Sequence, residues 1–135
     1  MKTLVLFYSY SGNTKARAQE LASREQADIE EVLDVRLPGK LKAYTAGIVA
    51  AIRGKAWPIR PLRSDLASYD RLVLFTPVWA DNPAPPFSSV IALLPPDKSV
   101  RVIMVSASGK SKCRDRLEAE IAAKGCTLEA FEDIT

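Results

Sequence analysis

The chain has 135 residues, of which 47% are hydrophobic and 26% are charged. Nineteen Lys and Arg residues against sixteen Asp and Glu residues leave a net charge of only +3, an excess too small to indicate nucleic-acid binding. The chain contains no histidine, which excludes a Ser-His-Asp triad and every metal site built on histidine ligands. Because a hydrophobic core rarely divides below roughly 250 residues, we expect residues 1–135 to form a single domain.

The first half of the chain predicts two strands and two helices. Residues 4–8 form a continuous apolar run, which is typical of a strand buried on both faces. An apolar stripe at helical spacing follows within residues 14–24, and a second lies within residues 41–52. Residues 29–35, between the two stripes, mix polar and apolar side chains, which indicates an edge strand.

The second half continues this alternation. Residues 72–75 and 102–105 are again continuous apolar runs, and we expect both to be buried strands. Helices are predicted around residues 90–94 and over residues 113–121, and the mixed polarity of residues 127–134 indicates a second edge strand. The resulting order, β-α-β-α-β-α-β-α-β, predicts a doubly wound α/β sandwich of three layers around a five-stranded parallel sheet.

The sequence indicates a cytoplasmic protein. Cys113 and Cys126 are too few for a zinc site or a disulfide framework, and we expect reduced, buried thiols, with a single bridge between them as the alternative. No signal peptide is visible, and the apolar stretch at residues 43–52 is shorter than the roughly 20 residues of a membrane span. We expect no metal site, no contact with a membrane or nucleic acid, and no catalytic pair of carboxylates.

Three polar loops follow the three buried strands, at residues 9–14, 76–82 and 106–111. In an open parallel sheet, ligands bind beyond the carboxyl ends of the strands, near the point where the strand order reverses. We therefore expect the three loops to form one binding site.

The first loop is rich in hydroxyl groups. Ser9, Ser11, Asn13 and Thr14 surround Gly12, and the loop leads into the first predicted helix. Hydroxyls and the free N–H groups of a helix start bind phosphate with neutral donors, and glycine lets the backbone approach closely. The alternative is an ordinary turn in which Asn13 or Thr14 only caps the helix. Because the loop lacks the Walker pattern, a phosphate here would be held rather than transferred.

The second and third loops suit a flat ligand. Trp79 lies just past the second buried strand, where its ring can stack on a planar aromatic group. The alternative is a tryptophan packed over the end of the sheet. The third loop offers small hydroxyl residues and Gly109, which together admit the edge of a flat ligand. The three loops therefore predict a site for a phosphorylated planar cofactor.

The loops resemble those of a known family. Residues 8–14, Tyr-Ser-Tyr-Ser-Gly-Asn-Thr, resemble the phosphate-binding signature of the flavodoxin family. Residues 76–80, Thr-Pro-Val-Trp-Ala, resemble the segment that encloses the isoalloxazine ring in many flavodoxin-like proteins, and Ala46-Gly47 with Arg53-Gly54-Lys55 resemble the second crossover of short bacterial members. The similarity covers nearly the whole chain in order. It implies FMN as a non-covalent cofactor and electron transfer as the function.

The resemblance also implies a role for each loop. The first would hold the FMN phosphate, the second would line one side of the flavin, and the third would meet the pyrimidine edge or the opposite face. The backbone of residues 80–82 is the implied sensor of protonation at flavin N5. The predicted cofactor-binding residues are Ser9, Tyr10, Ser11, Gly12, Asn13, Thr14, Pro77, Val78, Trp79, Ala80, Asn82, Ser106, Ala107, Ser108 and Gly109.

The chain departs from the family in its charge. Typical flavodoxins are strongly acidic, whereas this chain is slightly basic, and its third loop has Lys110 and Lys112 nearby but lacks the aromatic residue that commonly stacks there. A basic surround accepts acidic partners or nucleotide phosphates. Besides an electron carrier that serves a redox partner protein or a small-molecule acceptor, two alternatives stay open: an FMN-dependent NAD(P)H:quinone-type reductase and a flavin-free interaction module.

The resemblance further implies the strand order 2-1-3-4-5. With right-handed crossovers, the first helix then lies on one face of the sheet and the next three on the other. The pattern of predicted elements ends with the fifth strand, so we expect no C-terminal helix to return to the first face. We expect strands three and four to expose apolar surface there, and a homodimer or a heterologous partner to cover it.

Overall fold

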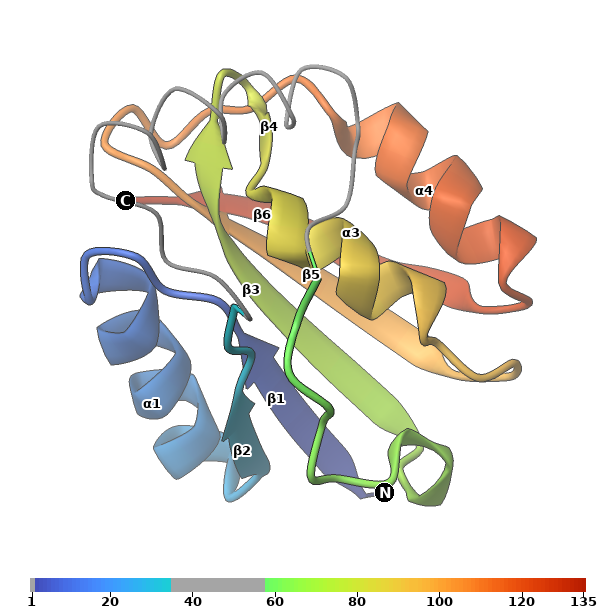
Figure 1. Ribbon diagram of the computed structural model, residues 1–135. Coiled ribbons are helices and arrows are strands. Elements are labelled where there is room, and N and C mark those ends of the chain that lie inside the picture. Colours follow the sequence, from blue (N-terminus) through green and yellow to red (C-terminus); the bar gives the residue numbers. More distant parts are fainter. Residues whose placement is uncertain (1, 35–57) are drawn as a thin grey trace.

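The computed structural model describes residues 2–34 and 58–135 and shows a sheet between two layers of helices (Figure 1). Within these ranges the main strands run parallel in the order β2-β1-β3-β5-β6, and a short strand, β4, pairs with β3. Apart from β4, this is the predicted order 2-1-3-4-5, and the doubly wound parallel sheet is confirmed. The strands are β1 Thr3–Phe7, β2 Asp28–Glu31, β3 Arg71–Trp79, β4 Asn82–Pro83, β5 Ser99–Val105 and β6 Thr127–Ile134.

The helices cover both faces of this sheet (Figure 1). Helix α1, Asn13–Glu25, lies on one face, and α3, Pro85–Ala92, and α4, Arg114–Ala123, lie on the other. A 3-10 turn, Leu66–Ser68, precedes β3. Helix α3 begins earlier than predicted, because two prolines occupy its first turn, where a missing N–H costs nothing. The helix predicted over residues 41–52 lies outside the described residues. So do Ala46-Gly47 and Arg53-Gly54-Lys55, which resemble the second crossover of short flavodoxin-like proteins. Within the described ranges, no helix combines the length and the apolar character needed to cross a bilayer.

Strand β3 is longer than the sequence predicts. Residues 76–79 are expected in a loop, but they continue the strand. The reason is tertiary: β5 pairs with β3 as far as Pro77, and β4 then pairs antiparallel with Val78 and Trp79. The loop after β3 is thereby reduced to a tight turn at Ala80 and Asp81.

The side chains of the central strands alternate between two apolar cores. On β3, Leu72 and Leu74 belong to the core beneath α3 and α4, whereas Val73 and Phe75 belong to the core beneath α1. A strand that supplies two cores carries no polar positions in between, which explains the continuous apolar runs. Both cysteines are free and buried, as expected.

The α1 face does not expose the apolar surface that the sequence predicts. Val73, Phe75, Ile103 and Val105 belong to the core on this face and are 0%, 2%, 2% and 3% exposed. The expectation of an exposed apolar patch on the third and fourth predicted strands is therefore wrong for the described residues. The homodimer or heterologous cover of this face stays a prediction, and exposed apolar surface no longer supports it.

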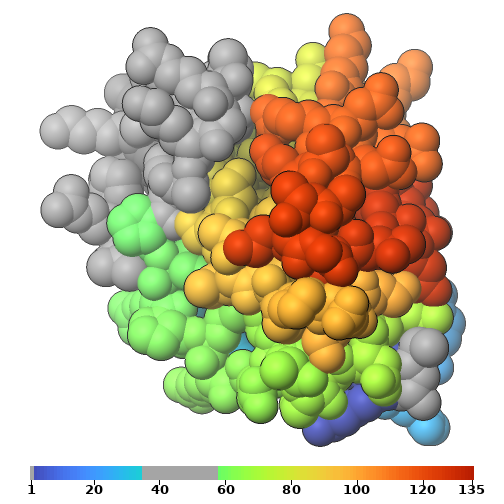
Figure 2. All heavy atoms as spheres, turned by 90° about the vertical axis from the view of Figure 1, so that its right-hand side faces the viewer, coloured from blue at the N-terminus to red at the C-terminus, as the bar shows by residue number. Residues whose placement is uncertain are grey.

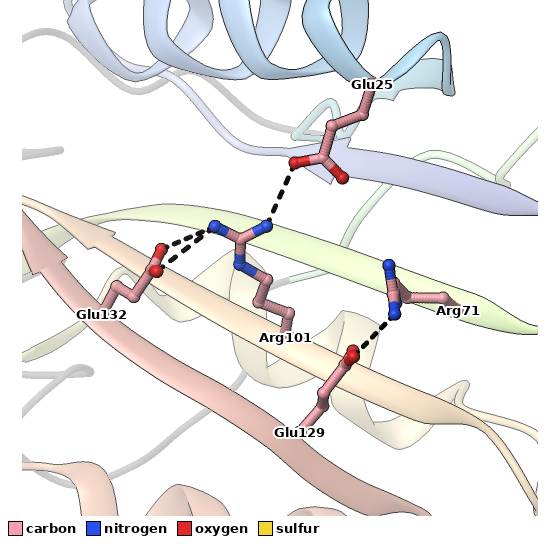
Figure 3. Close-up of polar contacts among 5 residues, drawn as sticks. All are labelled: Glu25, Arg71, Arg101, Glu129 and Glu132. Atoms are coloured by element: carbon pink, nitrogen blue, oxygen red, sulfur yellow. Dashed lines mark hydrogen bonds and ion pairs between the residues drawn. The ribbon is translucent and has the colours of Figure 1, made fainter.

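Charged side chains lie over this face beside α1 (Figure 3). Arg101, from the middle of β5, pairs through Nη1 with Glu25 of α1 at 3.2 Å and through Nη2 with Glu132 of β6 at 3.0 Å. Arg71 of β3 pairs with Glu129 at 2.7 Å. Arginine stems can cover apolar surface while their charged ends meet carboxylates, and α1 packs on the same core through Ala18, Leu21 and Ala22. An open groove of about 700 Å³ remains between α1 and β6.

Replacing Arg101 is expected to destabilise the fold more than replacing Arg71. Arg101→Met keeps an apolar stem but leaves Glu25 and Glu132 without their shared cation, so we expect the free energy of unfolding to fall by about 1–2 kcal/mol at low salt. Arg71→Met, which loses a single carboxylate partner, is the matched control and should cost less than half as much. Urea titrations measure both losses. Equal losses in the two variants, or losses that persist at high salt, would contradict this account.

Candidate functional site

The loops predicted to form the site meet at one edge of the sheet (Figure 1). β1 and β3 are parallel, with Phe7 opposite Phe75, and β5 runs parallel on the other side of β3, so the carboxyl ends of all three lie together. β2 and β3 flank β1 on opposite sides, which places the switch point of the sheet between β1 and β3. The structure therefore brings the loops at residues 9–14, 76–82 and 106–111 to one place.

In the first loop, neither Asn13 nor Thr14 caps the start of α1. Gly12 is the N-cap residue, with a φ of 99°, and Asn13 and Thr14 already belong to the helix. A turn capped by Asn13 or Thr14 is therefore excluded. Instead, Ser9 Oγ accepts hydrogen bonds from the N–H groups of Gly12, at 3.0 Å, and Lys15, at 3.2 Å.

The outer side of this loop is polar and open. Tyr10, Ser11, Gly12 and Asn13 are exposed, and a Cβ added at Gly12 would meet nothing within 4 Å. A positive φ with open space above it suits a glycine that another group can approach closely. Thr14 differs from its neighbours: it is 3% exposed, so its side chain lies within the protein.

Trp79 connects the first and second loops. Its ring makes edge-on contacts with the rings of Tyr8, at 6.3 Å between centroids, and Tyr10, at 5.8 Å. Trp79 also packs against the core beneath α3 and α4 and remains partly exposed. The interpretation of Trp79 as a residue packed over the end of the sheet is therefore confirmed in part. Its stacking on a planar ligand stays a prediction, for which the ring keeps exposed surface.

A polar pair beside Trp79 was not predicted. Tyr8 Oη donates a hydrogen bond of 2.8 Å to Asp34 Oδ2. Burial raises the pKa of the Tyr8 hydroxyl, and the carboxylate of Asp34 raises it further. Burial also raises the pKa of Asp34, although the bond from Tyr8 opposes that shift. A tyrosine that ends a buried strand needs a partner for its hydroxyl, but the sequence does not say which distant residue provides it.

The third loop is a compact turn after β5. The N–H of Gly109 donates to Ser106 O at 3.3 Å, and the N–H of Lys110 donates to Ser108 Oγ at 3.2 Å. Gly109 has a φ of 66°, and a Cβ there would lie 3.3 Å from Thr135 Cγ2. The two residues between Ser106 and Gly109 are exposed, so the turn presents backbone and a hydroxyl at the same edge as the other loops.

Hydrogen bonds join the third loop and α4 to the second loop. The N–H of Lys112 donates to Asp81 O at 3.1 Å, and Arg116 Nη1 donates to Asn82 Oδ1 at 2.9 Å. Arg116 lies in α4 and is absent from the predicted site residues, because helical spacing places it on no apolar stripe and in no loop. Only the fold reveals that it faces the second loop.

The assembled loops offer several groups that can bind a ligand. Hydroxyls and N–H groups lie at the start of α1, an aromatic ring ends β3, and the third loop adds a polar edge. In the part of the chain that the structure describes, no three His, Cys, Asp or Glu side chains lie together as metal ligands. Neutral donors of this kind can bind an anion, and an aromatic ring can contact a flat ligand.

No family model matches the sequence, and no curated protein matches it. Solved structures do match. A flavoprotein from Lactobacillus acidophilus, crystallised in complex with FMN, aligns with a TM-score of 0.79 and 23% identity, over 96% of this chain and 91% of its own. The flavodoxin of Megasphaera elsdenii aligns with a TM-score of 0.59 and 17% identity, over 98% of this chain and 85% of its own. The flavodoxin of Streptococcus pneumonia TIGR4 aligns with a TM-score of 0.54 and 14% identity, over 98% and 83%.

At these identities the likeness concerns the architecture, and it agrees with the strand order and helix placement described above. It also agrees with the fold implied by the resemblance of residues 8–14 and 76–80. The chain has the flavodoxin-like fold.

Proposed function

We propose that the chain binds FMN non-covalently and transfers electrons through it. The observation that carries this proposal is the meeting of three loops at the switch point of the sheet, where the start of α1, Trp79 and the third loop come together. A flavoprotein of the same fold has been crystallised with FMN, which supports the choice of cofactor. Bound FMN supplies the redox chemistry, because its ring system accepts and returns electrons.

In this proposal the first loop holds the phosphate. Ser11 and Asn13 are exposed, and the open space above Gly12 lets an anion reach the backbone N–H groups at the start of α1. The helix dipole adds partial positive charge at that point. Ser9 Oγ uses its oxygen to accept two N–H groups, which leaves its O–H as a donor toward the phosphate.

The second and third loops would enclose the flavin ring. Trp79 and Tyr10 form an aromatic corner, with 5.8 Å between their centroids, and Pro77 and Val78 are partly exposed beside them. The third loop, with the Ser108 hydroxyl and an exposed backbone, suits the polar pyrimidine edge. The apolar and aromatic groups keep water from the ring, while the polar groups fix its orientation.

A second candidate function is an FMN-dependent NAD(P)H:quinone-type reductase. Lys110 and Lys112 are exposed beside the third loop, and cations there suit nucleotide phosphates as well as an acidic redox partner. Either function fits the cytoplasmic location that the sequence predicts. The two differ in one respect: a reductase oxidises NADH or NADPH unaided when given a quinone, whereas a carrier depends on a separate electron donor.

Purified protein mixed with excess FMN and then desalted is expected to keep absorption bands near roughly 370 and 450 nm, the positions of oxidised flavin. Riboflavin, which lacks the phosphate, should be retained less well. Adding NADPH and a quinone to the FMN-loaded protein then distinguishes carrier from reductase. A colourless protein that leaves FMN fluorescence unchanged would rule out both redox functions and favour the flavin-free interaction module.

Ser11→Asp is expected to weaken FMN binding by about tenfold and to leave riboflavin binding unchanged, because the added carboxylate repels the phosphate. Ser11 is exposed, so the substitution should leave the fold intact. Ser11→Asn, which is similar in size and neutral, is the matched control. Fluorescence titrations give the dissociation constants of both ligands. An equal loss for FMN and riboflavin would show that the phosphate binds elsewhere.

A further inference from the structure

The turn between β3 and β4 is strained and contains no glycine. Trp79 pairs with Asn82, and the two residues between them, Ala80 and Asp81, have φ values of 51° and 65°. Hairpin turns with two positive φ values are usually built from Asn-Gly or Asp-Gly. Ala80 is unfavourable in such a turn, because its Cβ crowds the backbone and its side chain offers no compensating hydrogen bond. Hydrogen bonds from neighbouring side chains must therefore stabilise this conformation.

Asn82 and Arg116 supply such bonds. Asn82 Nδ2 donates to the carbonyl oxygen of Ala80 at 2.7 Å, and Asn82 Oδ1 accepts from Arg116 Nη1 at 2.9 Å. A guanidinium only donates and a carbonyl only accepts, so a single orientation of the Asn82 amide satisfies both. Arg116 thereby selects the orientation that holds Ala80. The bond from the N–H of Lys112 to Asp81 O adds a further support from the same segment.

Arg116 is itself held in place. It lies near the start of α4, beside Leu117, which is 0% exposed and fixes the helix in the core. Arg116 Nε also lies 3.8 Å from Glu120 Oε1, one turn further along the helix. Figures 1 and 2 both show the orange chain that enters α4 beside the yellow-green turn after β3. A rigid helix therefore supports the strained turn.

We propose that Arg116, acting through Asn82, positions Trp79 for the ring of the bound cofactor. The inference rests on the proposed function, because it takes Trp79 as the aromatic wall of a flavin site. Trp79 is the last residue of β3 and directly precedes Ala80, so the conformation of the turn sets the direction of its side chain. The ring of Trp79 also contacts the ring of Tyr10, with 5.8 Å between their centroids. Arg116 is thus a positioning residue that acts on the protein and not on the ligand.

The protein without cofactor tests whether Arg116 positions Trp79. In a Trp57→Phe background, Trp79 is the sole tryptophan of the chain. Arg116→Met is expected to shift Trp79 emission to longer wavelength and to increase its quenching by acrylamide, because the turn loses its support. Arg114→Met removes an equal charge from an exposed position of the same helix and should change neither signal. Unchanged Trp79 emission in Arg116→Met overturns the proposal.

Two further variants test the route through Asn82. Asn82→Asp keeps an acceptor for Arg116 but loses the donor to Ala80, so it should reproduce the emission change of Arg116→Met. It also serves as the test if Arg116→Met fails to fold, which far-ultraviolet circular dichroism would reveal. Ala80→Gly removes the crowding that makes the bonds necessary, so Arg116→Met should have a smaller effect in that background. If Arg116→Met changes Trp79 emission equally with and without Ala80→Gly, Arg116 does not act through Asn82 on the turn at Ala80.

Fluorescence titration tests the consequence for the cofactor. Arg116→Met is expected to weaken FMN and riboflavin binding by the same factor, about tenfold, because the loss concerns the ring and not the phosphate. Unchanged affinity in a variant whose Trp79 emission has shifted overturns the positioning role. If the unmodified chain binds neither ligand, the proposed function fails, and the cofactor role of Arg116 fails with it. In that case, a changed Trp79 emission in Arg116→Met would still show that Arg116 positions Trp79, and an unchanged emission would show that it does not.

Discussion

Burial of the central strands on both faces is the constraint on which the rest of the molecule depends. In the middle of β3, Leu72 and Leu74 enter one core while Val73 and Phe75 enter the other, so residues 72–75 leave no position for a polar group that could meet a ligand. The polar side chains of β3 are thereby confined to either side of these residues, at Arg71 and Thr76. Because β1, β3 and β5 are parallel and in register, their carboxyl ends coincide, and the polar loops are gathered at one edge. The position of the candidate site therefore follows from the pairing of the strands and not from the sequence of any single loop.

The elements that could be predicted from sequence are those whose deciding pattern lies within one short segment. Continuous apolar runs identify the central strands, mixed runs identify both edge strands, and hydroxyls around Gly12 identify the first loop. The burial of the α1 face could not be predicted, because it depends on Arg101 meeting Glu25 and Glu132 from two other elements. The extension of β3 and the placement of Arg116 are of the same kind: each depends on where an element distant in sequence ends or begins.

Arg101 and Arg116 both connect distant elements through their side chains. Arg101 joins α1 to β6 across the face of the sheet, and Arg116 joins α4 to the turn after β3. A guanidinium suits this task because its donors are fixed in a plane and can engage two acceptors at once, as Arg101 does with Glu25 and Glu132. Lysine, with a single compact charge on a flexible stem, would hold neither arrangement as firmly. In a small domain, such connections order surface that a limited core cannot.

The carboxylates of β6 also affect how a second copy of the chain could pair with this strand. β6 is the last strand on its side of the described sheet, and its eight residues offer unpaired backbone groups to any neighbouring chain. Glu129, Glu132 and Asp133 line this strand. A second copy adding its own β6 would have to strip water from these groups and set like charges against each other. The residues that neutralise Arg71 and Arg101 within one molecule therefore also oppose the growth of the sheet from molecule to molecule, and protect this edge against aggregation.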